Sequence, residues 1–309
     1  MTTSEWLVAA DEAGLRLDKF IAAANRLGSR SRAADALTKG KVFLNDAEVG
    51  IPDAGYVLAA GDRVRVWADR PGSAQRKGPH RDSVLDIVYE DAAIIAVNKP
   101  AGLLTVPLAR RENDPSVLSL LAASLKKRGA RPPLVVHRID RDTSGLVLFA
   151  RTPSAQADLK EQFRRREPER VYWAVVHGGP SPAEGTWRDH LTWDGDALRQ
   201  EETDEDDPRA AEAISHYRVL ERFRHATLVE VRLVTGKRNQ IRIQASLHGH
   251  PLVGERQYMD GAPSRQAIPF DRQALHARRL NISHPVTGEF VNLECDPPAD
   301  LAGLIARLR

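Results

Sequence analysis

The sequence has little that could support disulfide or thiolate chemistry. Cys295 is the single cysteine among 309 residues, so an intrachain disulfide is excluded. The same scarcity argues against a zinc site built from cysteines. One cysteine also fits the reducing cytoplasm, which is where we expect the protein.

Long apolar runs are absent as well. No stretch approaches the roughly 20 residues that a membrane-spanning helix needs, so we expect no membrane partner. The first residues, MTTSEWLVAADEAG, lack a basic region followed by an apolar run, and we expect no secretory signal. Apolar residues make up 42% and charged residues 28% of the chain, which is typical of a globular protein long enough for two domains.

The usual cofactor signatures are missing too. The sequence contains no G-x-G-x-x-G, Walker A, H-E-x-x-H or G-x-S-x-G pattern. His248 and His250 stand without further ligands at a recognisable spacing, which favours a structural role over metal binding. If the protein is an enzyme, we expect it to work with side chains alone, without a cofactor or metal.

The charge is modest overall but uneven. The net charge is +3 and the pI about 9.1, yet residues 16–41 carry seven Lys or Arg against two Asp, and residues 126–172 carry twelve against six acids. Acids gather in one run, 201–207, which we expect in an exposed loop. Basic stretches suit a polyphosphate partner, although charge alone does not separate this from an ordinary solvated surface.

Two domains are predicted, with a linker between them. In residues 14–70, Leu17, Phe20, Ile21 and Ala24 recur at helical spacing, and a second helix and a small sheet follow. Residues 71–83 are rich in Pro, Gly, Ser and charge and read as the linker. Residues 84–309 form the second domain.

Many strands and few helices are predicted in this second domain, which indicates an α+β fold. The apolar strand candidates after residues 84–97 are 145–150, 171–177, 226–234 and 290–294. The helical candidates are 116–128, 154–165 and 240–249.

One polar turn lies between two apolar strands. The segment HRIDRDTSG, residues 137–145, follows LVV and precedes LVLFA. Such a polar cluster costs stability unless its members pair or act. From local chemistry, a turn stapled by its own hydrogen bonds and a functional turn are equally good interpretations.

Several motifs together resemble one family. HRIDRDTSG resembles the H-R-L-D-x-x-T-S-G signature of the RluA family of pseudouridine synthases, with Ile139 for Leu. Further blocks occur in the family's order and cover nearly all of residues 84–298: YED to VNKPAGL (89–103), RVYWA (170–174), TGKRNQIR (235–242), HPLVGE (250–255), LHA (275–277) and HPVTGE (284–289). The N-terminal segment is similar to an S4-like RNA-binding module.

The resemblance implies an α+β catalytic domain with a mixed, largely antiparallel sheet, preceded by the small S4-like α/β domain. It also implies isomerisation of a uridine in RNA to pseudouridine, which keeps every atom and needs no cofactor. Ribosomal RNA of the large subunit is the preferred target, transfer RNA is the alternative, and a monomer is the default. The resemblance does not decide between a covalent adduct and a glycal intermediate.

The resemblance also assigns the site. Asp140 matches the family's catalytic aspartate, although by chemistry alone Asp142 is an alternative. Arg242 matches the basic partner of that aspartate. Tyr172 matches the tyrosine that lies against the target base. Arg138 matches a residue that fills the gap left by a flipped nucleotide, and a phosphate contact or surface ion pair is an equal alternative. The other expected RNA-binding residues are Arg30, Arg32, Lys39, Lys41, Lys237 and Arg238.

Some residues depart from the family pattern, and these departures leave the subfamily, and therefore the RNA target, open. Lys237, Arg238 and Asn239 replace the commoner Arg, Thr and His, and Gln244 replaces a common His. Three other functions compete: a catalytically idle RNA-binding or ribosome-assembly protein, a hydrolase that uses Ser144 with His137 and an aspartate, and a small-molecule enzyme. The basic N-terminal module makes the small-molecule enzyme less attractive. The idle alternative would be favoured by loss of the catalytic matches, and all of these are present.

Overall fold

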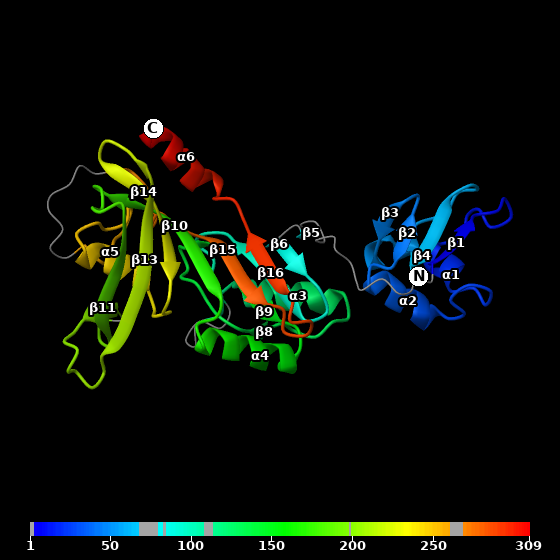
Figure 1. Ribbon diagram of the computed structural model, residues 1–309, viewed down its shortest axis with the longest axis horizontal. Helices are drawn as coiled ribbons and strands as arrows, with labels where there is room; N and C mark the ends of the chain where they lie inside the picture. The colour runs from blue at the N-terminus through cyan, green and yellow to red at the C-terminus, as the bar shows by residue number, and fades with distance from the viewer. Residues whose placement is uncertain (1–2, 68–79, 83–84, 108–113, 198, 260–267) are drawn as a thin grey trace. The chain divides into compact units, whose positions relative to one another are not determined.

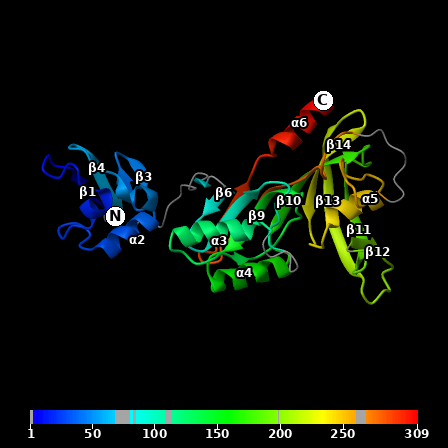
Figure 2. The same ribbon diagram turned by 180° about the vertical axis from the view of Figure 1, so that it is seen from behind.

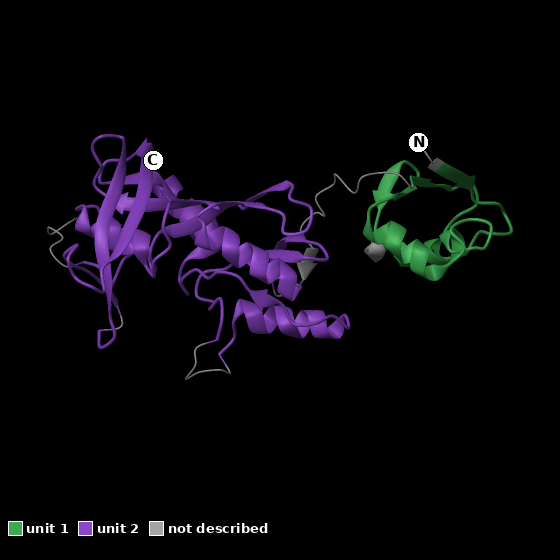
Figure 3. Ribbon diagram, turned by 60° about the horizontal axis from the view of Figure 1, so that its bottom comes forward, with its two compact units in different colours: residues 1–77 green, residues 78–309 purple. Residues whose placement is uncertain are grey.

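The computed structural model describes residues 3–67, 80–82, 85–107, 114–197, 199–259 and 268–309. The chain divides into two compact units, Met1–Lys77 and Gly78–Arg309 (Figure 3). Of the expected linker, residues 71–79 and 83 lie outside the described residues, whereas 80–82 form a strand of the second unit. No helix in the described part of the chain is long and apolar enough to cross a membrane.

The first unit is a four-stranded antiparallel sheet with short helices. The strands, in the order β1-β4-β2-β3, are β1 (Thr3–Leu7), β4 (Arg63–Trp67), β2 (Val42–Leu44) and β3 (Ala47–Val49). The helices are α1 (Leu17–Ile21), α2 (Arg30–Thr38) and the 3-10 helix η1 (Ile51–Gly55). This arrangement is consistent with an S4-like module.

Local signals explain most of this unit. The Ser29 side chain caps α2 by accepting from the backbone N–H of Arg32. Asn45 and Asp46 both adopt positive φ in the turn between β2 and β3. Two expectations fail: α1 ends at Ile21, before Ala24, and β1 adds a strand ahead of residue 14.

The second unit is built on a large sheet (Figures 1 and 2). Its order is β12-β11-β13-β14-β10-β15-β9-β7-β6-β5, with β16 beside β15 and β8 beside β9. The strands are β5 (His80–Asp82), β6 (Leu85–Glu90), β7 (Ile94–Lys99), β8 (Leu134–Val135), β9 (Ser144–Ala150), β10 (Glu169–His177), β11 (Glu184–Asp194), β12 (Arg199–Glu202), β13 (Ala211–Arg222), β14 (Ala226–Leu233), β15 (Leu275–Ser283) and β16 (Phe290–Glu294). All described pairs of named strands are antiparallel except β9 with β15, so the sheet is mixed and mostly antiparallel as predicted.

Four helices cover the two faces of this sheet. They are α3 (Val117–Lys127), α4 (Pro153–Arg164), α5 (Gln240–Leu247) and α6 (Ala299–Leu308). Successive side chains of the fully buried β9 alternate between two clusters: Val147 and Phe149 pack with α3 and α5, and Leu146 and Leu148 pack with α4. Residues 137–143 lead into β9, so the predicted catalytic turn lies at the edge of this core.

The parallel pairing of β9 with β15 depends on one glycine. Gly145 has φ +111°, and a Cβ atom there would lie 2.3 Å from the carbonyl oxygen of Ala277. No other residue type allows the two backbones to approach so closely. The close approach fixes the start of β9, five residues after Asp140.

Candidate active site

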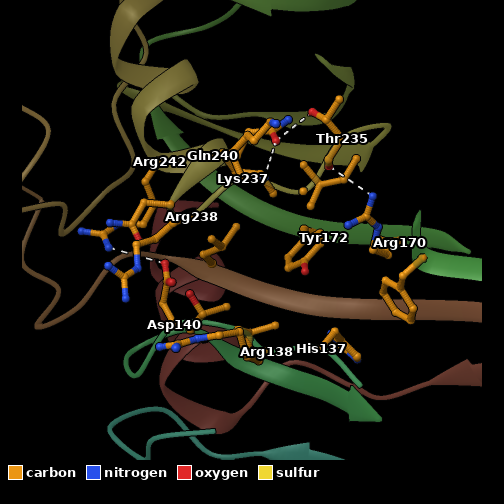
Figure 4. A pocket seen from close by; sticks show the side chains of 18 of the residues that line it. His137, Arg138, Asp140, Arg170, Tyr172, Thr235, Lys237, Arg238, Gln240 and Arg242 are labelled. Atoms are coloured by element: carbon orange, nitrogen blue, oxygen red, sulfur yellow. Dashed lines mark hydrogen bonds and ion pairs between the residues drawn. The ribbon is translucent and has the colours of Figure 1, made fainter. Parts of the chain in front are cut away.

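A cavity of about 550 Å³ is lined by residues from the start of α5 and from the end of α4. Most of its lining comes from three segments: the turn 137–143, the end of α4 with the start of β10, and residues 235–242 (Figure 4). Leu233 of β14 and Leu275 of β15 complete it. Its volume falls within the range of about 300–1,000 Å³ that is typical of small-molecule sites. Of the site residues predicted in the second unit, all six line this cavity: Arg138, Asp140, Tyr172, Lys237, Arg238 and Arg242.

The backbone on either side of Asp140 is fixed by residues from the segment 99–105. The Thr105 hydroxyl donates to the carbonyl of Ile139 at 2.9 Å and accepts from its N–H at 3.3 Å. On the other side, the Lys99 ammonium donates to the carbonyl of Arg141 at 2.8 Å, and the Gly102 N–H donates to the same oxygen at 2.9 Å. These bonds explain why the N-K-P-x-G segment and the aspartate turn occur together.

The Asp140 carboxylate faces the cavity beside Arg242. Nη1 of Arg242 lies 3.5 Å from Oδ2 of Asp140, and 26% of the Asp140 side chain is exposed. Burial raises the pKa of Asp140 above its ordinary value, while the nearby Arg242 guanidinium opposes the rise. The carboxylate therefore stays partly accessible to a ligand and depends on nearby donors for its charge.

Arg242 is itself held by a second carboxylate that the sequence did not predict. Its Nε and Nη2 donate to the two oxygens of Glu255 at 2.8 and 2.7 Å, a bidentate pair with both side chains largely buried. Burial alone would raise the pKa of Glu255, but these bonds lower it. Glu255 thus directs the guanidinium, whose remaining nitrogen reaches Asp140.

Tyr172 on β10 lies in the same cavity, and 9% of it is exposed. Burial raises the pKa of its hydroxyl, so the phenol stays protonated through the neutral range. Figure 4 shows its ring beyond the Asp140–Arg242 pair, on the side towards Arg170. An aromatic face and a carboxylate are therefore presented to one ligand-sized space.

Cations surround the cavity on two sides. Lys237 and Arg238 lie on the α5 side, and the Arg238 guanidinium stacks 4.3 Å from the ring centre of Trp193 on β11. Lys160, Arg164 and Arg166 lie on the α4 side. The α4 residues were not predicted individually, although they belong to the basic stretch 126–172.

The basic residues predicted in the first unit divide into two groups. Arg30 lines a hollow of about 390 Å³ together with Arg16 and Lys19. Arg32, Lys39 and Lys41 are not among the residues that line it. Lys39 is exposed and pairs with Asp35 at 2.9 Å.

The residues that the sequence offered as alternatives to Asp140 lie in different surroundings. Asp142 does not line the cavity and pairs with Arg141. Ser144 is 1% exposed, and its Oγ lies 3.0 Å from Nδ1 of His276 rather than beside His137. His137 accepts a hydrogen bond from the N–H of Leu148 at 3.0 Å, and burial lowers its pKa to about 3. This geometry excludes the hydrolase with Ser144 and His137.

Two of the departures from the family pattern, Gln244 and Asn239, have different surroundings. The Gln244 amide donates to Asp189 at 2.7 Å and accepts from Ser215 at 2.6 Å, inside the packing between α5 and the sheet. Asn239 instead lines the cavity, immediately before α5. Of these two, only Asn239 adjoins Asp140. Lys237 and Arg238, the other departures in this segment, line the same cavity.

Comparisons with known proteins identify the family of the chain. Residues 93–247 match the family model described as RNA pseudouridylate synthase. An uncharacterised RNA pseudouridine synthase of Bacillus subtilis is 37% identical over 297 residues, covering 95% of this chain and 94% of that protein. A protein of Xylella fastidiosa named ribosomal large subunit pseudouridine synthase D is 37% identical over 311 residues, covering 96% and 90%.

A solved structure shows the same fold. The human protein RNA pseudouridylate synthase domain containing 4 matches with a TM-score of 0.60 at 23% identity. The match covers 72% of this chain and 92% of the human chain.

Proposed function

The chain belongs to the RluA-type RNA pseudouridylate synthase family, an RNA-modifying isomerase class, and we propose that it converts a specific uridine of large-subunit ribosomal RNA with Asp140 as the nucleophile. One observation carries the assignment of the nucleophile. Asp140 is partly exposed to a cavity that also presents Arg242 and Tyr172. Asp142, the other aspartate of the turn, does not line that cavity.

The reaction needs a carboxylate beside the sugar. The bond between N1 of uracil and C1′ of ribose breaks, the base turns, and a bond between C5 and C1′ forms. The proton on C5 leaves and N1 gains one, so the product has the atoms of the substrate. Asp140 acts either by attacking C1′ or by removing a sugar proton to give a glycal, and both routes require the carboxylate in its charged form.

The target nucleotide enters the cavity flipped out of its stack. Tyr172 offers an aromatic face on which the base stacks, and burial keeps its hydroxyl protonated, so that it can serve as a proton donor. Arg138 is exposed at the edge of the cavity, where it either fills the space left by the base or contacts a phosphate. Lys237 and Arg238 on one side and Arg166 on the other hold the strand by its phosphates.

Two observations favour large-subunit ribosomal RNA as the substrate. Several relatives at 33–37% identity, among them those of Zymomonas mobilis and Xylella fastidiosa, carry a name that specifies the large ribosomal subunit. The first unit adds a hollow lined by Arg16, Lys19 and Arg30, which suits the phosphates of a structured RNA. Transfer RNA is the competing substrate.

Release of tritium from RNA labelled at C5 of uridine tests this proposal, because the C5 hydrogen leaves during the reaction. The labelled RNA is taken from cells that lack the protein and separated into large-subunit ribosomal, small-subunit ribosomal and transfer RNA. We expect release from the large-subunit fraction only. Release from transfer RNA alone would overturn the substrate assignment, and binding without release from any fraction would support the idle RNA-binding alternative.

A further inference from the structure

We propose that Asn239 is a positioning residue for Asp140, whose carboxylate it holds through its side-chain amide; this deepens the proposed role of Asp140 and rests on it. With its nitrogen turned towards Asp140, the amide lies 3.0 Å from Oδ1 and 3.0 Å from Oδ2. The Arg242 contact with the same carboxylate is longer, at 3.5 Å. The amide is therefore placed to fix the direction in which the carboxylate points.

The surroundings of the amide decide its orientation. The Tyr258 hydroxyl accepts from the backbone N–H of Gln200 at 3.1 Å, which leaves its proton to be donated. The Asn239 oxygen lies 3.0 Å from that hydroxyl when the nitrogen faces Asp140. The opposite orientation sets the amide oxygen against the Asp140 carboxylate, and both are acceptors. In that orientation the nitrogen donates to the Tyr258 hydroxyl at 3.0 Å and to Gln257 at 3.4 Å, so neither Asp140 contact is satisfied.

The backbone supports the same role. Asn239 precedes α5 in the N-cap position, yet it has φ +54° and its side chain makes no capping hydrogen bond. Asparagine is among the few residues that adopt this left-handed conformation readily. The side chain is thus released from the usual capping role and directed into the cavity.

The charges around Asp140 show why an additional donor matters. Arg242, Arg138 and Lys99 act on it as cations, Glu255 as an anion, and Tyr172 as a neutral phenol. Arg242 already donates two hydrogen bonds to Glu255. A neutral amide that donates to both carboxylate oxygens favours the charged form of Asp140 without adding a charge of its own.

The first test needs no RNA. In protein labelled with ¹³C at the aspartate carboxyl carbons, the Asp140 signal is assigned by its loss in Asp140→Asn and then titrated in the wild type and in Asn239→Gly. Glycine retains the left-handed backbone and removes only the amide. We expect the pKa of Asp140 to rise by about one unit, because it loses a donor. An unchanged titration in Asn239→Gly would overturn the proposal.

Two further variants complete this test. Tyr258→Phe leaves Asn239 in place but removes the hydroxyl that orients its amide, so we expect a smaller rise of the Asp140 pKa. Asn45→Gly is the matched control, because Asn45 is also left-handed, with φ +49°, but belongs to the first unit. We expect no change of the Asp140 pKa in this control. A shift as large as that of Asn239→Gly would show that the effect is not specific to position 239.

The second test measures tritium release from a large-subunit ribosomal RNA transcript as a function of pH. At pH values below the pKa of Asp140, we expect kcat of Asn239→Gly to be about tenfold lower than kcat of the wild type. At higher pH we expect kcat to recover, and KM should stay within about twofold of the wild-type value. An equal loss at every pH, or a rise of KM alone, would mean a merely structural role. If the wild-type protein releases no tritium, the proposed substrate is wrong. The titration of the Asp140 carboxyl group would still test the role of Asn239, because it needs no RNA.

Discussion

The ammonium group of Lys99 lies 2.8 Å from the carbonyl oxygen of Arg141, the residue that follows Asp140. Lys99 is fully buried, and its other two donors reach the carbonyls of Pro100 at 2.9 Å and Leu103 at 2.8 Å. Three carbonyl acceptors match the three donors of the amine in its protonated form, which is the form present below its pKa. A single buried lysine thus joins residues 100–103 to the turn that carries Asp140, the proposed nucleophile.

This lysine predicts a specific dependence of stability on pH. Burial lowers the pKa of Lys99 from 10.5 to about 7, with Asp142 and Asp140 opposing the shift. At pH values between about 7 and 10.5, Lys99 is protonated in the unfolded chain but has lost its proton in the folded protein. The free energy of unfolding therefore rises with pH in this range. Relative to Lys99→Met, the wild-type free energy of unfolding should rise by about 1.4 kcal/mol per pH unit. Urea unfolding of both proteins from pH 7.5 to 9.5 measures the difference, and parallel curves would contradict it.

We expect one methyl group added at Gly145 to lower the stability of the protein strongly. In Gly145→Ala the new Cβ would lie 2.3 Å from the Ala277 carbonyl, at a φ of +111°. Gly129→Ala is the control, because Gly129 has φ +69° and open space around it. The control should lose about 1–2 kcal/mol through its backbone alone, and Gly145→Ala at least about 2 kcal/mol more. Equal losses in thermal unfolding would show that β9 and β15 are free to separate.

Arg238 should affect RNA binding rather than the chemical step. Its exposed guanidinium stacks on Trp193 at the cavity edge, whereas Arg218 is exposed, pairs with Glu230 and does not line the cavity. We expect Arg238→Ala to raise KM and to reduce the slope of log binding constant against log salt by about 0.7–0.9, with kcat unchanged. Arg218→Ala should match the wild type. A loss of kcat in Arg238→Ala with an unchanged salt slope would refute the phosphate contact.

Tyr172 offers a test of base stacking. Tyr172→Phe keeps the aromatic face, and Tyr172→Leu removes it while filling a similar buried space. We expect KM to stay near the wild-type value in the phenylalanine variant and to rise about tenfold in the leucine variant, since stacking is worth about 1–3 kcal/mol per base. A kcat decrease in Tyr172→Phe would assign a proton-transfer role to the hydroxyl. Equal KM values in both variants would argue against stacking.

The sequence predicts those parts of the fold that local patterns determine. Apolar runs with clear ends predicted β9, β10, β14 and β16 to within a few residues, and the helical candidates 116–128 and 154–165 correspond to α3 and α4. β11 and β13 were missed because many of their residues are polar and remain partly exposed, so no apolar run marks them. The acidic run 201–207 was expected in a loop, yet Glu201 and Glu202 belong to β12.

In the site, too, the sequence predicted the residues that lie in recognisable motifs and missed contacts between separate segments. The family resemblance joined Asp140 to Arg242, which are 102 residues apart, because both lie in recognisable motifs. The contacts of Glu255 with Arg242 and of Asn239 with Asp140 were not predicted, because they depend on side-chain directions across separate loops. In the sequence, Asn239 stood out only as a departure from the commoner residue.

The central claim is that Asp140 performs the chemistry, and pseudouridine mapping in cells tests it most directly. Total RNA is mapped from cells that lack the protein and carry either the wild type or Asp140→Asn, which preserves the shape of the side chain but removes its charge. We predict that a specific pseudouridine is lost without the protein, returns with the wild type and does not return with Asp140→Asn. Equal restoration by the two would contradict the account, since Asp140 would then not be the nucleophile.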